Sequence, residues 1–323
     1  MPAVIKLATL NINAITNRTR VGMLNEYIRR HDLDIIFIQE IKDPELIQML
    51  GYDVYYNIGS DIRGTAIVAR NDIRLHNINK SPSGRAIAAE YKGVYIVNIY
   101  APSGTAKRTE REHFYNVEVP QLLQTGHGEI IIGGDFNCVL DPADTTGHFY
   151  TSRALTEMVR ELHLKDTWKQ DQNRPAYTHY SNTGASRIDR IYVSSDIATK
   201  ITGIDFLPAA FTDHNAVVVH LALGEMGMRR RTPRWKLDPT MLRDDKLKNQ
   251  LRQQWSRWQN QKSWHPNINT WWDQYVKPRI QRYMRRWGAE RRRDFKIMED
   301  HLYTCIYDIQ KQDPPPLTRN LLL

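Results

Sequence analysis

Short runs of strand-forming residues recur along the chain from Val4 to Leu221, and only a few helical stretches separate them. Val4–Ile12 shows enough apolar–polar alternation to be a strand, and Leu33–Ile38 is an apolar run with the length of a buried strand. Between these two runs, Arg20–Arg30 carries apolar residues at helical spacing. The chain is therefore predicted to open as a strand, a helix and a second strand.

The same patterns predict further strands and two further helices. The strands are Tyr52–Tyr56, Thr65–Ala69, Ile73–Ile78, Ala86–Tyr91, Val94–Tyr100, Ile130–Ile132, Ile188–Val193, Ile201–Phe206 and Ala216–Leu221. The helices are Glu112–Leu123 and Ser152–Leu162, and Ser152 is the expected N-cap of the second. The run at Ile130–Ile132 is expected to stop at the two glycines that follow it. Because strands outnumber helices, we predict two sheets with helices outside them.

Polar side chains stand where these buried runs end or begin. They are Asn11, Glu40, Asp135, Asn137, Asp189, Asp213 and His214. Strand ends at a common edge are where a rigid scaffold presents catalytic groups. Carboxylates suit a hard cation such as Mg²⁺, which also binds water and substrate phosphate. Such a cation polarises a phosphoryl oxygen, so the set is compatible with phosphate ester hydrolysis.

Each of these residues alone has a simpler structural interpretation. An Asp or Asn after a strand is usually a turn former or a helix cap, and Glu40 alone would be a solvated charge. His214 alone would be a surface or partly buried histidine. Asp189 lies within an apolar run and needs a partner if it is buried, which could be Arg187 or Arg190. The catalytic interpretation depends on all of these residues occurring together and in order.

Six segments carry a resemblance to a known family. They are Leu10-Asn11-Ile12-Asn13, Gln39-Glu40, Asn98-Ile99-Tyr100-Ala101-Pro102, Gly134-Asp135-Phe136-Asn137, Ser186-Arg187-Ile188-Asp189-Arg190-Ile191 and Thr212-Asp213-His214. In this order they resemble the motifs of the exonuclease–endonuclease–phosphatase superfamily, up to about Leu223. The resemblance implies a DNase I-like four-layer α/β sandwich, with two packed mixed sheets, helices outside and the active site at one edge.

The resemblance also implies which residues hold a metal ion. Glu40 resembles the principal metal ligand, and Asn11 lies beside it on metal or phosphate. Asp213 resembles a second metal-side or proton-handling carboxylate. The implied cofactor is Mg²⁺, with Mn²⁺ as an alternative, and no small-molecule cofactor is expected.

Other residues resemble those that act on phosphate and water. Asp135 resembles the residue that orients or deprotonates the attacking water, and Asn137 a neighbour that holds phosphate or water. His214 resembles the residue that contacts the scissile phosphate, and Asp189 its orienting carboxylate. The division of labour among Asp135, Asp213 and His214 stays open. Three further residues are expected at the site: Tyr100, Thr178 and Thr212, the last replacing a serine that is common in the superfamily.

Two features favour the LINE-type endonucleases within this superfamily. The segments Leu10–Asn13, Asn98–Pro102 and Ser186–Ile191 are most similar to that branch. Secreted DNases have signal peptides and disulfides, whereas this chain has two cysteines, and its first ten residues are too soon followed by polar residues to be a secretory signal. We expect an Mg²⁺-dependent endonuclease that nicks DNA, as in LINE-type (non-LTR) retrotransposons, on a chain without the reverse transcriptase. The alternatives are an RNA nuclease or phosphomonoesterase of the same fold, or a non-catalytic relic that binds nucleic acid.

A change in composition near residue 225 predicts a second domain. Residues 1–224 contain 23 Lys and Arg against 25 Asp and Glu, a net charge of −2, whereas residues 225–323 contain 22 against 11, a net charge of +11. Seven of the eight tryptophans lie in the second part. We predict an endonuclease domain over 1–224 and a basic, Trp-rich, mostly helical extension over 225–323, disordered from about Asp313.

The predicted helices of the extension are Leu242–Trp258 and Trp271–Met298. Interleaved cations and aromatics suit binding of DNA, or of RNA, by phosphate neutralisation and stacking. A helical pair that packs its tryptophans in a core explains the same composition. The absence of a secretory signal and of an apolar run of about 20 residues predicts a nuclear or cytoplasmic protein with no membrane partner.

Overall fold

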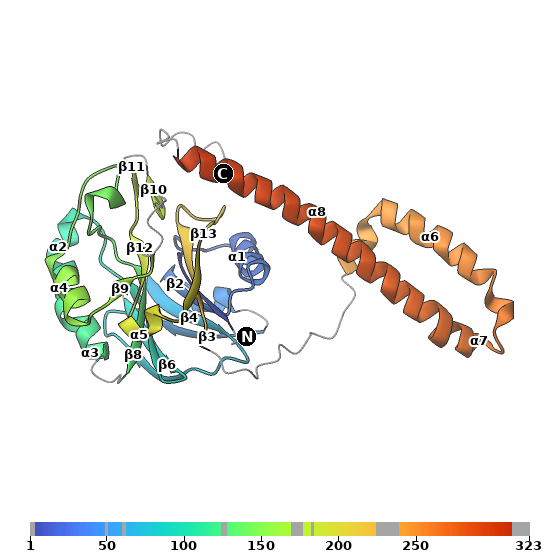
Figure 1. Ribbon diagram of the computed structural model, residues 1–323, viewed down its shortest axis with the longest axis horizontal. Coiled ribbons are helices and arrows are strands. Elements are labelled where there is room, and N and C mark those ends of the chain that lie inside the picture. The colour runs from blue at the N-terminus through green and yellow to red at the C-terminus, as the bar shows by residue number, and fades with distance from the viewer. Residues whose placement is uncertain are drawn as a thin grey trace. The chain divides into compact units, whose positions relative to one another are not determined.

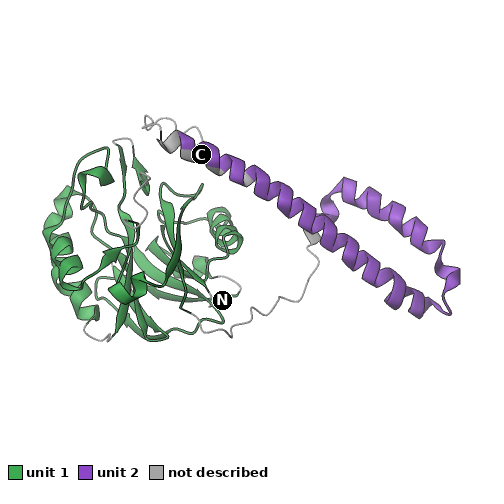
Figure 2. Ribbon diagram, viewed as in Figure 1, with its two compact units in different colours: residues 1–228, 313–323 green, residues 229–312 purple. Residues whose placement is uncertain are grey.

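The computed structural model describes residues 4–48, 51–59, 63–123, 128–168, 177–181, 184–223 and 239–311. The chain forms two compact units, residues 1–228 with 313–323 and residues 229–312 (Figure 2). The boundary predicted between residues 224 and 225 and the predicted disordered end both lie outside the described residues.

Two six-stranded mixed sheets form the centre of the first unit (Figure 1). The first sheet has the order β13 (Ile201–Pro208), β14 (Asn215–Leu221), β1 (Ile5–Asn11), β2 (Ile35–Ile41), β4 (Gly64–Arg70) and β3 (Tyr52–Asn57). The second has the order β5 (His76–Lys80), β6 (Ala86–Tyr91), β7 (Val94–Tyr100), β8 (Glu129–Asp135), β12 (Asp189–Val193) and β9 (Lys165–Asp166). A separate hairpin joins β10 (His179–Ser181) to β11 (Gly184–Ser186).

Side-chain alternation along the strands produces the layers. In β1 and β2, Leu7, Ile35 and Phe37 belong to the core shared with the second sheet. Their neighbours Ala8 and Ile36 belong to a different core, on the opposite face of the same sheet. Because successive side chains of a strand point to opposite faces, a sheet buried on both faces needs apolar residues at nearly every position.

Helices cover the outer face of each sheet and complete four layers. On the first sheet lies α1 (Arg18–Arg30), which begins after Asn17, whose side chain accepts from the Arg20 amide. On the second sheet lie α2 (Arg108–His113), α3 (Val119–Leu123) and α4 (Arg153–Glu161). The predicted N-cap of α4 is confirmed, since the Ser152 side chain accepts from the Leu155 amide. A short helix, α5 (Ser195–Ala198), follows β12.

The strand expected to stop before Gly133 instead continues to Asp135. Pairing with β7 sets Ile99 opposite Gly134 and Tyr100 opposite Asp135. A Cβ at Gly134, where φ is +149°, would collide with the Ile99 carbonyl. The glycines therefore allow close approach of two backbones rather than ending the strand, and this extension carries Asp135 to the edge of the sheet.

The strand predicted at Ile73–Ile78 is displaced along the sequence. It begins at His76, and Ile73 and Leu75 are buried in the segment before it. Apolar residues there serve the core without pairing in the sheet, which a local pattern does not distinguish.

The second unit is a helical pair. α6 (Asp245–Gln259) and the first half of α8 (Lys277–Lys311) lie side by side, joined through α7 (Ile268–Thr270) (Figure 1). Leu247 packs with Met284, and Trp258 packs with Trp271. Both helices predicted for the extension are thus present. Among the described helices, none is long and apolar enough to cross a membrane.

Candidate active site

The ends of six strands lie at one edge of the sandwich. β1 and β2 run parallel, and β14 runs antiparallel to β1, so β14 begins where the other two end. In the second sheet β7 and β8 are parallel, and β12 begins opposite the end of β8, with Asp189 paired to Asp135. The predicted residues Asn11, Glu40, Tyr100, Asp135, Asp189 and His214 all lie at or next to these ends.

Buried amides join the two sheets beneath this edge. Asn98 Nδ2 donates to the carbonyls of Ile38 and Ala66 at 2.9 and 2.7 Å. Gln39 Nε2 donates to Asn98 Oδ1 at 2.6 Å. The motif residue Asn98 therefore fixes the spacing of the sheets, and with it the distance between side chains that the two sheets contribute.

Glu40 occupies an irregular position in β2. The pairing with β4 shifts register between Gln39 and Ile41, and Glu40 has a φ of +60°. Such a left-handed residue costs on the order of 1 kcal/mol or more, and bulges of this kind re-aim side chains near active sites. Asn11 Nδ2 donates to Glu40 Oε1 at 3.2 Å, and the Tyr100 hydroxyl donates to the same oxygen at 3.1 Å.

Asn11 links Glu40 to the second carboxylate of the site. Its Nδ2 also donates to Asp135 Oδ2 at 2.9 Å, and Asp135 Oδ1 accepts from the Asn137 amide at 2.9 Å. Asn137 has a φ of +47°, and its own Nδ2 donates to the Ala101 carbonyl. The predicted set of Asn11, Glu40, Asp135 and Asn137 is thus connected by hydrogen bonds.

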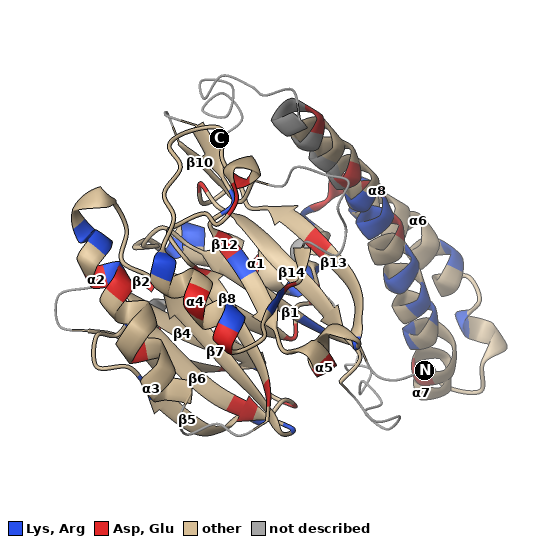
Figure 3. Ribbon diagram, turned by 60° about the vertical axis from the view of Figure 1, so that its left-hand side comes forward, with Lys and Arg blue, Asp and Glu red and all other residues tan. Residues whose placement is uncertain are grey.

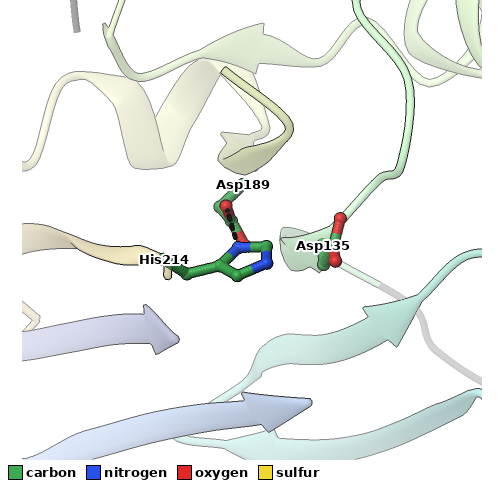
Figure 4. A group of neighbouring side chains, drawn as sticks. All are labelled: Asp135, Asp189 and His214. Atoms are coloured by element: carbon green, nitrogen blue, oxygen red, sulfur yellow. Dashed lines mark hydrogen bonds and ion pairs between the residues drawn. The ribbon is translucent and has the colours of Figure 1, made fainter. Parts of the chain in front are cut away.

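His214 and Asp189 form the predicted pair. His214 Nδ1 lies 2.8 Å from Asp189 Oδ2, and both side chains are buried. Figure 4 shows the His214 ring between Asp189 and Asp135, with the hydrogen bond on the Asp189 side. The Thr178 hydroxyl accepts from the amides of Ile188 and Asp189 at 3.1 and 3.0 Å. Thr178 is itself buried and holds the backbone that carries Asp189.

The arginines that flank Asp189 have other partners. Arg187 Nε contacts Asp144 Oδ1 at 2.8 Å, and its Nη1 contacts Asp166 Oδ2 at 2.8 Å. Arg190 Nη2 contacts Asp144 Oδ2 at 3.1 Å. The interpretation of Asp189 as a partner of Arg187 or Arg190 is therefore wrong. Both arginines thus contact Asp144, and Asp189 pairs with His214 instead.

Burial and nearby charges shift the pKa values of Asp135 and His214. Burial and the nearby Asp189 charge raise the pKa of Asp135 to about 7, although His214 and the hydrogen bonds from Asn11 and Asn137 oppose this. Burial alone would lower the pKa of His214, but the Asp189 carboxylate raises it to about 9. The Asp189 carboxylate therefore favours the imidazolium form of His214, and the raised pKa of Asp135 shifts this carboxylate toward the range of a general base.

Thr212 and Asp213 directly precede His214, just before β14 begins. Asn13 Nδ2 donates to Asp213 Oδ1 at 3.1 Å, and the Thr212 hydroxyl donates to the Asn11 carbonyl at 2.9 Å. Burial opposes ionisation of Asp213, but contacts with His179 and His214 hold its pKa below the usual range. Asp213 is therefore ionised at neutral pH.

Three residues at the site were missed by the sequence reasoning. Arg63 contacts Glu40 Oε2, Asn13 donates to Asp213, and the ring of His179 packs against His214. Asn13 lies in the first motif and His179 follows Thr178, so proximity to expected residues was an available signal for both. No local pattern marked Arg63.

The donor set at this edge fits a hard divalent cation. Glu40 and Asp135 supply carboxylate oxygens, which are ligands that Mg²⁺ accepts, whereas the Asn11 Nδ2 donates to both carboxylates and its oxygen accepts from the Asn13 amide. Asp135, Asp189 and His214 also bring potential ligand atoms within 4.8 Å of one another. We favour the Glu40 side, because an imidazolium cannot bind a cation and His214 Nδ1 is already engaged by Asp189.

Known proteins share this sequence pattern. Residues 8–214 match the model of the Endonuclease/Exonuclease/phosphatase family. The Transposon TX1 uncharacterized 149 kDa protein of Xenopus laevis is 24% identical over 298 residues, covering 83% of this chain and 22% of that protein. An exodeoxyribonuclease of Bacillus subtilis is 23% identical over 193 residues, covering 55% of this chain and 72% of the relative. The chain spans about a fifth of the transposon protein.

Solved structures share the fold. An AP endonuclease from Archaeoglobus fulgidus superposes with a TM-score of 0.59 at 20% identity, covering 67% of this chain and 99% of that one. A 3′ phosphatase from Neisseria, bound to a product DNA hairpin, superposes with a TM-score of 0.58 at 22% identity and the same coverage. At these identities the likeness concerns the fold, and it confirms the predicted DNase I-like sandwich.

Proposed function

Since the chain belongs to the Endonuclease/Exonuclease/phosphatase family, we propose that it is an Mg²⁺-dependent endonuclease that nicks DNA, as in LINE-type retrotransposons. The observation that carries the proposal is the arrangement at the sandwich edge, where the His214–Asp189 pair lies beside Asp135 and the connected Asn11–Glu40 pair. The similarity to a transposon protein supports the LINE-type assignment.

In this proposal Glu40 would hold the cation with Asn11 beside it, and Asp213 would be a further metal-side carboxylate. A bound divalent cation neutralises charge on a phosphoryl oxygen and stabilises the leaving oxygen. Mn²⁺ offers the same chemistry as an alternative to Mg²⁺. The Tyr100 hydroxyl keeps Glu40 oriented, because burial and the Glu40 charge raise the tyrosine pKa and keep it a donor.

Asp135 and His214 act on the reacting atoms. Asp135 accepts a proton from the attacking water, with Asn137 beside it to hold water or phosphate. The His214 imidazolium donates to a phosphate oxygen as negative charge develops there. Asp189 fixes the orientation of His214 from its buried position behind the ring, as in other His–Asp pairs. Thr178 supports Asp189, and Thr212 supports the end of β1, so both act behind the substrate surface.

Asp213 has the opposite electrostatic character to Asp135. Because its pKa is held low, Asp213 is a poor proton donor to a leaving oxygen. Its ionised carboxylate instead supplies negative charge next to His214 and to the proposed cation. We therefore propose Asp135 as the general base, His214 as the hydrogen-bond donor to the developing charge and Asp213 as a fixed anion.

A comparison of substrates tests the proposal. The protein, supplied with Mg²⁺, should convert supercoiled plasmid to nicked circles faster than it degrades RNA or releases phosphate from phosphomonoesters. The nicked product should appear before linear DNA, since an endonuclease of this kind cuts one strand at a time. Faster cleavage of RNA or of a phosphomonoester would replace the DNA assignment by that alternative. Binding of DNA with no cleavage of any substrate would identify a non-catalytic relic.

We also propose that the helical unit contributes affinity for DNA or RNA. Figure 3 shows Lys and Arg along α8, where Arg282, Arg285, Arg286 and Arg291–Arg293 are all exposed. Core packing accounts for several tryptophans, since Trp258 and Trp271 are buried and Trp255 packs against them. Trp264 and Trp272 stay 76% and 42% exposed and are available for base stacking. Exposed arginines and tryptophans suit a nucleic-acid-binding protein, which we expect in the nucleus or the cytoplasm.

Removal of residues 225–323 should weaken DNA binding and flatten its salt dependence. Each phosphate neutralised on duplex DNA contributes about 0.9 to the slope of log K against log salt. Loss of a segment with a net charge of +11 should therefore lower the slope by several units, while Mg²⁺-dependent nicking at low salt survives. Salt titrations of binding by the full chain and by residues 1–224, each first shown to be folded, provide the measurement. Equal slopes would mean that the helical unit does not bind DNA.

A further inference from the structure

His179 occupies the active site although no motif singles it out. It begins β10, directly after Thr178, and its backbone forms an antiparallel bridge with His214. The centroids of the two imidazole rings lie 4.6 Å apart, with an angle of 46° between the ring planes. His179 therefore packs its ring on a face of His214 that the hydrogen bond with Asp189 does not restrain.

His179 has a second contact in the site. Its Nε2 lies 3.7 Å from Asp213 Oδ2, while Asn13 Nδ2 holds the other Asp213 oxygen at 3.1 Å. The His179 side chain is 25% exposed, whereas that of His214 is 6% exposed. His179 thus touches both His214 and Asp213 from the more open side of the site.

These contacts matter because the single hydrogen bond to Asp189 does not fix the orientation of the His214 ring. The bond at Nδ1 holds one atom of His214, and the broad χ2 torsion of histidine leaves the ring free to swing about it. A second ring packed against its face removes this freedom. A displacement of about 1 Å in a catalytic group lowers rates by up to about a hundredfold, so the restraint has a kinetic consequence.

We infer that His179 is a positioning residue for phosphodiester hydrolysis, an inference that rests on the proposed function. Its ring fixes the plane of His214, and its Nε2 steadies the Asp213 carboxylate. His179 acts through these two residues and takes no proton from the substrate. It would hold the site in its reactive geometry before DNA binds.

Three substitutions separate the two contacts. His179→Ala removes both, His179→Phe keeps a ring against His214 but loses the contact with Asp213, and His179→Gln keeps an N–H donor but loses the ring. We expect His179→Ala to lower kcat about 10- to 100-fold with KM within about threefold, since positioning affects the transition state more than ground-state binding. His179→Phe and His179→Gln should each recover part of the loss.

The chain offers a matched control in His220. Its Nε2 lies 2.9 Å from Asp205 Oδ2, and its side chain is 23% exposed, so it is also a half-open histidine paired with an aspartate. It lies in β14, away from the strand ends that form the site. His220→Ala should leave both kcat and KM unchanged. An equal loss in the two alanine variants would assign the effect to general destabilisation and overturn the inference.

A measurement without turnover completes the test. In NMR spectra of the full chain, the proton between His214 Nδ1 and Asp189 should give a downfield signal, which His179→Ala should shift or broaden and His179→Phe should largely restore. In the Asp213→Ala background, His179→Gln should gain no rate over His179→Ala, because alanine removes the acceptor oxygen that His179 contacts. Wild-type rates for His179→Ala in an active protein would overturn this inference alone. A wild-type protein that cleaves no phosphoester would instead overturn the proposed function.

Discussion

Replacement of Asp135 or His214 with alanine should lower kcat by more than about a hundredfold, while the Kd for DNA changes far less. Each residue acts on charge that develops in the transition state. In the proposed mechanism Asp135, whose pKa is raised by burial and by the Asp189 charge, accepts the proton of the attacking water. In the same mechanism His214, whose pKa the Asp189 carboxylate raises, donates to a phosphate oxygen as an imidazolium. Neither contribution is large in the ground-state complex.

Single-turnover nicking and equilibrium binding, measured on the same preparations, separate the two quantities. Asp205→Ala is the matched control, because Asp205 also pairs with a histidine but lies in β13, outside the site. Circular dichroism and thermal unfolding should show that each variant is folded. Near wild-type rates in folded Asp135→Ala and His214→Ala proteins would show that the site is wrongly assigned.

Removal of divalent cations should abolish nicking, and Mg²⁺ or Mn²⁺ should restore it. The carboxylates of Glu40 and Asp135 stand with Asn11 at one buried edge, which suits a hard cation and leaves a phosphate without neutralisation when none is bound. The assay is plasmid nicking in excess chelator, followed by titration with each cation. Undiminished nicking in excess chelator would rule out the metal mechanism.

Binding of Mn²⁺ without DNA tests which residues hold the cation. Glu40→Gln removes the charge of the proposed principal ligand and should raise the Kd for Mn²⁺ at least about tenfold, measured by electron paramagnetic resonance or calorimetry. Glu45→Gln is the control, because Glu45 lies five residues away and is exposed. Equal Mn²⁺ affinity in the two variants would move the proposed metal site away from Glu40.

Local patterns in the sequence were sufficient to predict the layers of the fold and the order in which the site residues occur along the chain. Apolar runs predicted most strands because a strand buried on both faces requires such runs. The six motifs placed acidic and amide residues at strand ends, and the topology brings those ends to one edge. The change in charge and in tryptophan content predicted a separate extension, and two stretches with almost no internal Gly or Pro predicted its helices.

Tertiary pairing decided what these patterns left open. Asn11 and Asp135 are 124 residues apart in the chain, yet they share a hydrogen bond. Whether Asp189 pairs with an arginine or with His214 depends on the register of β12 against β8 and on where Asp144 lies. The extension of β8 through Gly134 likewise depends on the partner strand.

The same holds for the way in which single side chains enter the site. His179 reaches His214 only because a bridge aligns β10 with the start of β14, and Glu40 turns into the site only because β2 bulges against β4. Spacing and composition indicate which residues of a single segment are buried, cap a helix or form a turn. The contacts that complete the site join segments distant in sequence, and register and backbone geometry between neighbouring strands, rather than any local preference, determine them.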